Sequence, residues 1–505
     1  MSGAGGPRPV RLNAFAMNTV GHQSPGLWTH PRDESHRYTD PDYWVELARL
    51  LERGGFDSVF LADVLGVYDV HGGSPDAALR HATQVPLNDP LLVVPLMAAA
   101  TKHLGFGVTC ALTYEQPYSF ARRMSTLDHL THGRIGWNIV TGYLDSAARN
   151  LGQSQQRAHD ERYDLADEYL DVVYKLWELS WEDGAVRRDK QARVFVDPAK
   201  VHAIGHRGEH YRVPGIHLCE PSPQRTPVLF QAGTSSRGRA FAGRHAECVF
   251  VSGPSVAVVK GYVDGLRQAA REAGRSEADL LIYGQALIIT APTSAEAQAK
   301  HEDLKRHIDV EATLTLLSGW TGVDFSRYPP DATIDYLDTQ AGRTALASFS
   351  SADPTRRWTV REAAEFIGLG GRGPVFVGDP AEIADQLIAW QDATGLDGFN
   401  LAYALAHETF RDVVDLVVPE LRRRGRYRPE VGQGADDDAN PRTLRARLFQ
   451  RGDRLPGNHA ARSVRLDELG APDASTGGVS VPSDSLASDH AALPSLNIPL
   501  TEPVA

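Results

Sequence analysis

The chain has 505 residues, of which 42% are apolar and 23% charged, and its formal net charge at pH 7 is −12. This balance suits a globular protein with a sizeable core, and it argues against a nucleic-acid or anionic-membrane partner, since both favour a concentrated basic surface. No apolar run approaches the roughly 18 residues of a membrane span, and the N-terminus lacks the apolar segment of a secretory signal. We therefore expect a cytoplasmic protein with no membrane span.

Eight strand-like segments rich in Val, Ile, Leu and Phe occur along the chain. They are Val10–Met17, Asp57–Ala62, Leu104–Leu112, Arg134–Thr141, Pro227–Gly233, Cys248–Ser252, Leu280–Thr290 and Gly398–Tyr403. Amphipathic helical patterns separate them, at Pro41–Arg53, Pro90–Lys102, Tyr118–Thr131, His159–Leu179, Val256–Ala273 and Pro380–Thr394. This alternation predicts an α/β fold with parallel strands. Eight strands favour a closed (β/α)8 TIM barrel, and an open doubly wound sheet is the structural alternative.

Two long segments do not fit a minimal barrel. Residues 180–226 are rich in Gly, Pro and charge, and residues 291–375 carry mostly helical patterns. We expect both to be insertions after strands of a barrel domain that spans 10–430, with 291–375 forming a lid over the site. Residues 431–467 keep apolar and basic character, which predicts a C-terminal strap and a candidate contact to a neighbouring subunit. The composition of 468–505 predicts a disordered tail.

The segment from Pro227 to Glu247 carries the strongest functional signal. Its apolar strand ends at Gly233, and Thr234, Ser235 and Ser236 open the helix that follows. The glycine permits a tight turn, and the hydroxyls, free N–H groups and positive end of the helix dipole favour a phosphate. Ser and Thr are also preferred N-cap residues, so an ordinary capped helix fits this segment as well.

Other polar residues follow the predicted strands, and a parallel barrel gathers such residues into one ring. His22 follows the first strand, Asp63 follows the second, and Thr109 and Asn138 end the third and fourth. The ring has hydroxyls and amides but no His-x-His metal pattern, no Gly-x-Ser-x-Gly elbow and no Walker loop. With only three scattered cysteines, we expect no metal site. Uncharged hydrogen-bonding groups beside a phosphate site suit an organic cofactor whose own atoms carry the reaction.

His159 and Tyr163 are four residues apart at the start of a predicted helix, so their side chains share one face. That face fits the same cofactor site. The charged residues Asp160, Glu161 and Arg162 between them also fit a helix surface with salt bridges, which is the structural alternative.

Five runs together resemble the nitrilotriacetate and dibenzothiophene-sulfone monooxygenase group of the bacterial-luciferase-like flavin monooxygenases. They are Phe60-Leu-Ala-Asp63, Gly133-Arg-Ile-Gly-Trp-Asn-Ile-Val-Thr141, Ala148-Arg-Asn-Leu-Gly152, His159-Asp-Glu-Arg-Tyr-Asp164 and Gln231-Ala-Gly-Thr-Ser-Ser-Arg-Gly238. The resemblance extends over about residues 10 to 430. Within the group, the runs 18–28 and 84–90 look closest to the long-chain alkane monooxygenases.

The resemblance implies a (β/α)8 enzyme that receives FMNH2 from a separate NAD(P)H-dependent flavin reductase and reacts it with O2. A C4a-hydroperoxyflavin would then oxygenate an apolar organic substrate, alkane-like or sulfone-like, and release FMN and water. It also implies a homodimer or homotetramer. The residues that it assigns to FMN binding are Asp63, Thr109, Asn138, His159, Tyr163, Ser235 and Ser236. The residues that it places near the reacting atoms are His22, Tyr68 and Gln84.

Two other functions fit the same barrel: a deazaflavin- or FMN-dependent reductase or dehydrogenase, and a non-catalytic flavin-binding protein. The substrate also stays open between alkane, sulfone, sulfonate and amine. Thr19 stands where the long-chain alkane enzyme has a cysteine, and Trp320 stands where sulfone-oxidising relatives have a histidine.

Overall fold

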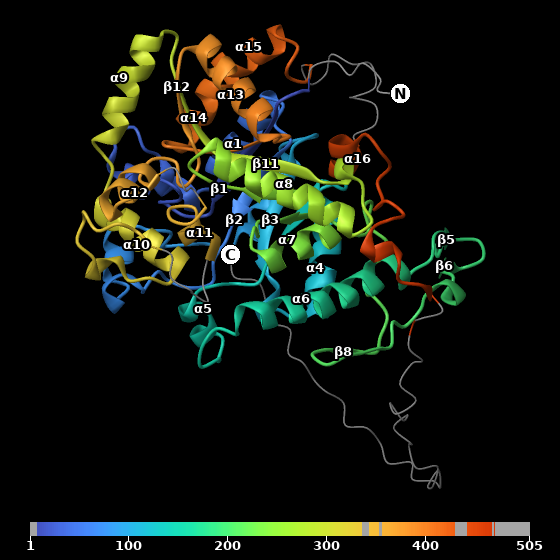
Figure 1. Cartoon of the computed structure of the whole chain (residues 1–505). Coiled ribbons are helices and arrows are strands. Elements are labelled where there is room, and N and C mark those ends of the chain that lie inside the picture. Colours follow the sequence, from blue (N-terminus) through green and yellow to red (C-terminus); the bar gives the residue numbers. More distant parts are fainter. Residues whose placement is uncertain (1–7, 336–342, 353–355, 430–441, 467–468, 470–505) are drawn as a thin grey trace, which may run out of the picture.

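A closed barrel of eight parallel strands forms the centre of the computed structural model, which describes residues 8–335, 343–352, 356–429, 442–466 and 469 (Figure 1). The strands pair in the order β1-β2-β3-β4-β9-β10-β11-β13, and β13 pairs back to β1. Their bounds are β1 Arg11–Met17, β2 Ser58–Ala62, β3 Gly105–Ala111, β4 Ile135–Val140, β9 Val228–Gln231, β10 Cys248–Val251, β11 Leu281–Thr290 and β13 Gly398–Ala402. Each strand coincides with one predicted segment, so the TIM barrel is confirmed and the open sheet is wrong.

Helices surround the barrel on its outer side. They are α1 Pro41–Arg53, α3 Val94–Ala99, α4 Pro117–Leu130, α6 His159–Tyr174, α7 Ser236–His245, α8 Val256–Glu272, α13 Pro380–Thr394, α14 Ala406–Asp412 and α15 Val418–Arg423. Two further short helices, α2 Asp76–Arg80 and α5 Asp145–Asn150, instead share a separate apolar cluster with Leu316. The helix predicted over Pro90–Lys102 is interrupted, because a 3-10 turn at Pro90–Leu92 precedes α3. Pro95 has no N–H to donate to the preceding turn, so α3 begins anew with this proline in its first turn.

Aromatic rings fill the inside of the barrel. Phe230 and Phe250 stack with their centroids 5.5 Å apart, and Phe60 lies 4.2 Å from Phe250. Gly136 on the neighbouring strand makes room for them, since a Cβ there would lie 2.3 Å from the Phe230 ring. The glycine in β4 is therefore a packing requirement of this core.

The two long interruptions have different structures. Residues 180–226 contain two short hairpins, β5 Val186–Asp189 with β6 Val194–Val196, and β7 His206–Arg207 with β8 Arg212–Val213. Residues 291–375 form the helices α9 Ser294–Lys305, α10 Val310–Thr321, α11 Arg343–Ala347 and α12 Val360–Ile367. The strand β12, Val375–Gly378, follows and pairs with the outer end of β11. It is the ninth strand of the sheet and lies outside the closed barrel.

The described part of the strap, residues 442–466, packs against its own barrel. Its helix α16, Leu444–Phe449, and the helices α10 and α12 lie on opposite sides of the barrel in Figure 1. Leu444 and Leu448 join the cluster of Phe60, Phe230 and Phe250 inside the barrel. A contact to a neighbouring subunit stays a prediction, and the predicted tail, apart from Leu469, lies outside the described residues.

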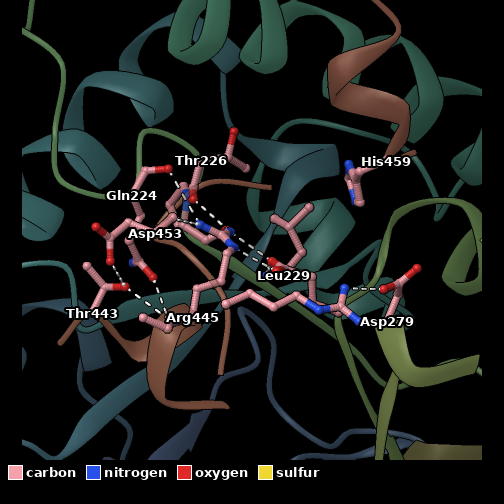
Figure 2. Close-up of polar contacts among 12 residues, drawn as sticks. Gln224, Thr226, Leu229, Asp279, Thr443, Arg445, Asp453 and His459 are labelled. Carbon is pink, nitrogen blue, oxygen red and sulfur yellow. Dashed lines mark hydrogen bonds and ion pairs between the residues drawn. The ribbon is translucent and has the colours of Figure 1, made fainter. Parts of the chain in front are cut away.

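Arg445 anchors α16 to the N-terminal ends of β9 and β10. Its Nε and Nη2 atoms donate to Glu247 at 2.7 and 2.8 Å, and both side chains are at most 3% exposed. Arg445 also donates to the carbonyl oxygens of Thr226, Pro227 and Asp453 (Figure 2). The pair is thus a buried ion pair whose guanidinium is fully hydrogen-bonded.

No helix among the described residues combines the length and apolar character that crossing a membrane requires.

Candidate functional site

Two adjoining cavities lie where the barrel strands end at their carboxyl sides. The first, here called the mouth cavity, has a volume of about 230 Å³. The second, the cradle cavity, has a volume of about 170 Å³ and shares Val140, Tyr143, Ala232 and Thr234 with the first. Five predicted site residues line the mouth cavity, namely His22, Asp63, Gln84, Thr109 and Asn138. Three line the cradle cavity, namely His159, Tyr163 and Ser235.

The cradle forms where β9 ends and α7 begins. Ser235 is the N-cap of α7, and its Oγ accepts a hydrogen bond from the N–H of Gly238 at 3.1 Å. A Cβ on Gly233 would lie 2.3 Å from Gln231 Nε2 and 2.9 Å from the Tyr163 hydroxyl. Any side chain at 233 would therefore fill the cradle. Ser236 is the first helical residue of α7 and does not line the cavity.

Charged residues at the start of α6 divide between the surface and the cradle. Asp160 pairs with His159 at 2.7 Å, and Asp164 pairs with Arg237 at 2.8 Å, as the surface alternative predicts. Arg162, by contrast, is 2% exposed, lines the cradle cavity and donates to the carbonyl of Gly142. A guanidinium in this position suits a phosphate. Arg162 was not predicted as a site residue, because a charged residue in a charged run is typical of a solvated face.

Amide side chains line both cavities, with Asn138 in the wall of the mouth cavity and Gln231 in the wall of the cradle cavity. Asn138 on β4 and Thr109 on β3 are register partners, and the Asn138 amide donates to the Thr109 hydroxyl at 2.9 Å. The Oδ1 atom of Asn138 and the Oε1 atom of Gln231 are buried and have no hydrogen-bond partner within the part of the chain that the structure describes. Buried acceptors are normally satisfied, so these two atoms indicate that a polar ligand completes the site.

Asp63 lies at the end of β2. Burial, and secondarily the charge of Asp89, raise the pKa of its carboxyl to about 8. The side chain is therefore mostly protonated at pH 7 and presents a neutral hydrogen-bonding group to the mouth cavity.

This pKa predicts a pH dependence of stability. The folded chain keeps the Asp63 proton up to about pH 8, whereas the unfolded chain loses it near pH 4, roughly. The free energy of unfolding should fall as the pH rises between these values, by at most about 1.4 kcal/mol per pH unit. Urea unfolding of the wild type and of Asp63→Asn at pH 5 and pH 7.5 measures this. The variant should gain stability relative to the wild type at the higher pH, and an unchanged difference contradicts the shift.

His22 is a neutral imidazole in the mouth cavity. Burial lowers its pKa to about 3, and its ring packs edge-on to Phe15 with the centroids 4.4 Å apart. Gln23 Nε2 lies 3.2 Å from His22 Nε2. His22 can therefore accept or donate a hydrogen bond near neutral pH, but it cannot supply positive charge.

Tyr68 stands one layer behind the cavity wall. It is 1% exposed and does not line the mouth cavity. Its hydroxyl donates to Gln84 Oε1 at 2.9 Å and lies 2.6 Å from the hydroxyl of Tyr143. Gln84 in turn donates to the carbonyl of His22 at 3.0 Å. Tyr68 thus positions Gln84 and Tyr143, which do line the cavity.

The insertion 291–375 contributes two residues to the mouth cavity, Trp320 of α10 and Arg372 before β12. The insertion thus supplies part of the cavity wall, and its closure over the site as a lid stays a prediction. Thr19 is buried, donates to the carbonyl of Pro86 at 2.6 Å and does not line the cavity.

Beside Tyr143 an apolar side pocket of about 80 Å³ opens, lined by residues that include Leu65, Ala111, Leu144 and Ala147.

Across the described ranges no group of three or more His, Cys, Asp or Glu side chains could hold a metal ion. The site combines a closed barrel, a helix N-terminus that suits an anion, a polar and aromatic cavity, and side chains of an insertion in the cavity wall. These features are typical of a TIM-barrel enzyme that acts on a small organic molecule. The model of the luciferase-like monooxygenase family matches residues 20–397. The chain belongs to this family and is a monooxygenase.

Similar proteins cover almost the whole chain. The dimethyl-sulfide monooxygenase of Hyphomicrobium sulfonivorans is 49% identical over 457 residues, 90% of this chain and 94% of the relative. The long-chain alkane monooxygenase of Geobacillus thermodenitrificans is 46% identical over 91% of this chain and 98% of its own length. The crystal structure of DmoA from Hyphomicrobium sulfonivorans matches with a TM-score of 0.84 and 47% identity, covering 94% of this chain and all of that one.

Proposed function

We propose that this monooxygenase binds reduced FMN delivered by a separate NAD(P)H-dependent flavin reductase and uses O2 to oxygenate a small organic substrate. The observation that carries the proposal is the continuity of the cradle with the mouth cavity, because it joins a phosphate site to a pocket for a ring system. A riboflavin lyase, RcaE, whose solved structure contains modified FMN, is 37% identical with a TM-score of 0.83 over 90% of this chain and 99% of that one.

The residues present fit FMN. Ser235, Tyr163, Arg162 and the N-terminus of α7 would hold the phosphate, with His159 beside them. The open acceptors of Asn138 and Gln231, with the Thr109 hydroxyl and the neutral Asp63, would meet the polar atoms of the ribityl chain and the ring. Bound reduced FMN would supply the electrons that activate O2.

The remaining residues would shape the reaction space. Gln84 and Tyr143, fixed by Tyr68, and the neutral His22 offer hydrogen bonds without adding charge. Trp320 and Arg372 of the insertion would exclude water from the mouth cavity. Without water, less of the activated oxygen would be lost as H2O2 before it reacts with the substrate. The small side pocket beside Tyr143 would take an apolar group of the substrate.

Rapid mixing tests the proposal. The protein is mixed anaerobically with FMNH2 and then with oxygenated buffer, with FMNH2 alone as the control. A transient absorbance band at shorter wavelength than that of oxidised FMN is expected, and its decay should accelerate when dimethyl sulfide or a short alkane is added. Immediate reoxidation at the rate of free FMNH2 would contradict the proposal and favour a non-catalytic flavin binder or a reductase.

The alternative of a deazaflavin-dependent reductase or dehydrogenase has weaker support. The F420-dependent secondary alcohol dehydrogenase is 15% identical with a TM-score of 0.52, so that likeness concerns the fold alone. The cytoplasmic location and the assembly into dimers or tetramers remain predictions.

A further inference from the structure

The mouth cavity carries one positive charge that the proposed reaction leaves without a role. Among its lining residues, only Asp63 and Arg372 belong to the charged residue types. Asp63 is mostly protonated at pH 7, because burial raises its pKa to about 8. His22 is neutral. Arg372 therefore gives the cavity its net charge.

Arg372 has no anionic partner. Among the residues that the structure describes, it makes no hydrogen bond or ion pair, and its guanidinium carbon lies 5.4 Å from the centroid of the Trp320 ring. The side chain is partly buried, and burial lowers its pKa. Water in the cavity can solvate the guanidinium, but a ligand that fills the cavity displaces that water. A cation desolvated in this way is costly unless an anion or acceptor replaces the water.

The backbone holds Arg372 in this position through the glycines on either side of it. The N–H of Gly370 donates to Ser24 Oγ, and its carbonyl accepts from Gln285 Nε2, both at 2.9 Å. A Cβ on Gly371, which has a φ of +80°, would lie 2.2 Å from Gln23 Oε1. One on Gly373 would lie 2.2 Å from the carbonyl oxygen of Gln285. The turn is thus packed against β11 and the segment after β1, so Arg372 is presented to the cavity from a fixed backbone.

We propose that Arg372 is the counter-ion for a negative charge that the ligands bring into the mouth cavity. That charge has two sources: an anionic group of the substrate, such as a sulfonate or carboxylate, or reduced flavin, which is an anion near neutral pH. The second source rests on the proposed function. In either case the guanidinium exchanges water for charge-assisted hydrogen bonds when the cavity fills.

Binding measurements on two variants separate the sources. Arg372→Gln removes the charge, and Arg372→Lys keeps it as the matched control. Affinities are measured by fluorescence for oxidised FMN, by anaerobic titration for FMNH2, and by calorimetry for 1-propanesulfonate. We expect Arg372→Gln to weaken the binding of FMNH2 or of 1-propanesulfonate about tenfold or more. The dissociation constants of Arg372→Lys should stay within about a few-fold of the wild-type values. Oxidised FMN should bind equally well to all three proteins.

Each outcome has a defined meaning. Selective loss of FMNH2 affinity assigns the charge to the reduced flavin, and selective loss of 1-propanesulfonate affinity assigns it to the substrate. Two outcomes overturn the proposal. In the first, Arg372→Gln binds both FMNH2 and 1-propanesulfonate as the wild type does. In the second, it loses affinity equally for FMN and FMNH2 and binds 1-propanesulfonate unchanged. If the wild type binds no flavin, the proposed function fails, whereas the 1-propanesulfonate comparison still decides the role of Arg372.

Discussion

Replacing Arg445 with methionine is expected to lower the free energy of unfolding by about 3–5 kcal/mol, because it leaves the buried carboxylate of Glu247 without its cation. The carbonyl oxygens of Thr226, Pro227 and Asp453 lose a donor at the same time (Figure 2). Urea unfolding followed by tryptophan fluorescence and circular dichroism measures the loss as a shift in the midpoint.

Two further variants make this prediction specific. Arg442→Met removes a neighbouring exposed arginine whose hydrogen bond among the described residues is to Gln450, and it should change stability by no more than about 0.5 kcal/mol. The double variant Glu247→Gln with Arg445→Met removes both charges but keeps an acceptor for the N–H of Leu229. It should recover much of the loss, since the cost arises from an unpaired buried charge. Wild-type stability of the single variant Arg445→Met would contradict this account of the strap.

Removing two hydroxyls from the cradle should weaken FMN binding by at least about 100-fold. If these residues bind the phosphate as proposed, Ser235→Gly and Tyr163→Phe each delete one hydrogen-bond donor to it, and a hydrogen bond to a charged group contributes about 1.5–3 kcal/mol. Glycine is chosen at 235 because it is tolerated as an N-cap, so α7 should persist. Fluorescence titration with FMN gives the dissociation constants.

Riboflavin and Ser236→Ala serve as controls for the cradle. Riboflavin has no phosphate, so the double variant should bind it as the wild type does. Ser236 does not line the cavity, so its alanine variant should bind FMN normally. An equal loss of riboflavin and FMN affinity would mean that the cradle is not the phosphate site.

The barrel could be predicted from sequence because each of its strands is buried on both faces and therefore forms a compact run of apolar residues. The strand β12 was not predicted, because its four residues, Val375–Gly378, pair only with the outer end of β11. A run this short has no periodicity that separates it from a loop.

The positions of candidate site residues could be predicted where a residue directly follows a barrel strand. They were harder to predict for residues elsewhere in the chain. The register of β3 and β4 alone brings Thr109 beside Asn138. Arg162 and Arg372 escaped prediction, since the burial of a charged residue depends on which segments cover it. Tyr68 belongs to the long segment that follows β2. The path of this segment, rather than the register of a strand, places Tyr68 behind the cavity wall.

The position of α16 also determines when this fold can be completed during synthesis. Leu444 and Leu448 pack among the rings inside the barrel, yet they lie more than 40 residues after the last barrel strand. While α16 is still inside the ribosome, the barrel lacks these two leucines at the N-terminal ends of its strands. Its aromatic interior is then exposed to water and to chaperones. Residues that emerge late in synthesis therefore complete a core that the first strand began, so we expect a chain cut short after β13 to be a substrate for proteolysis.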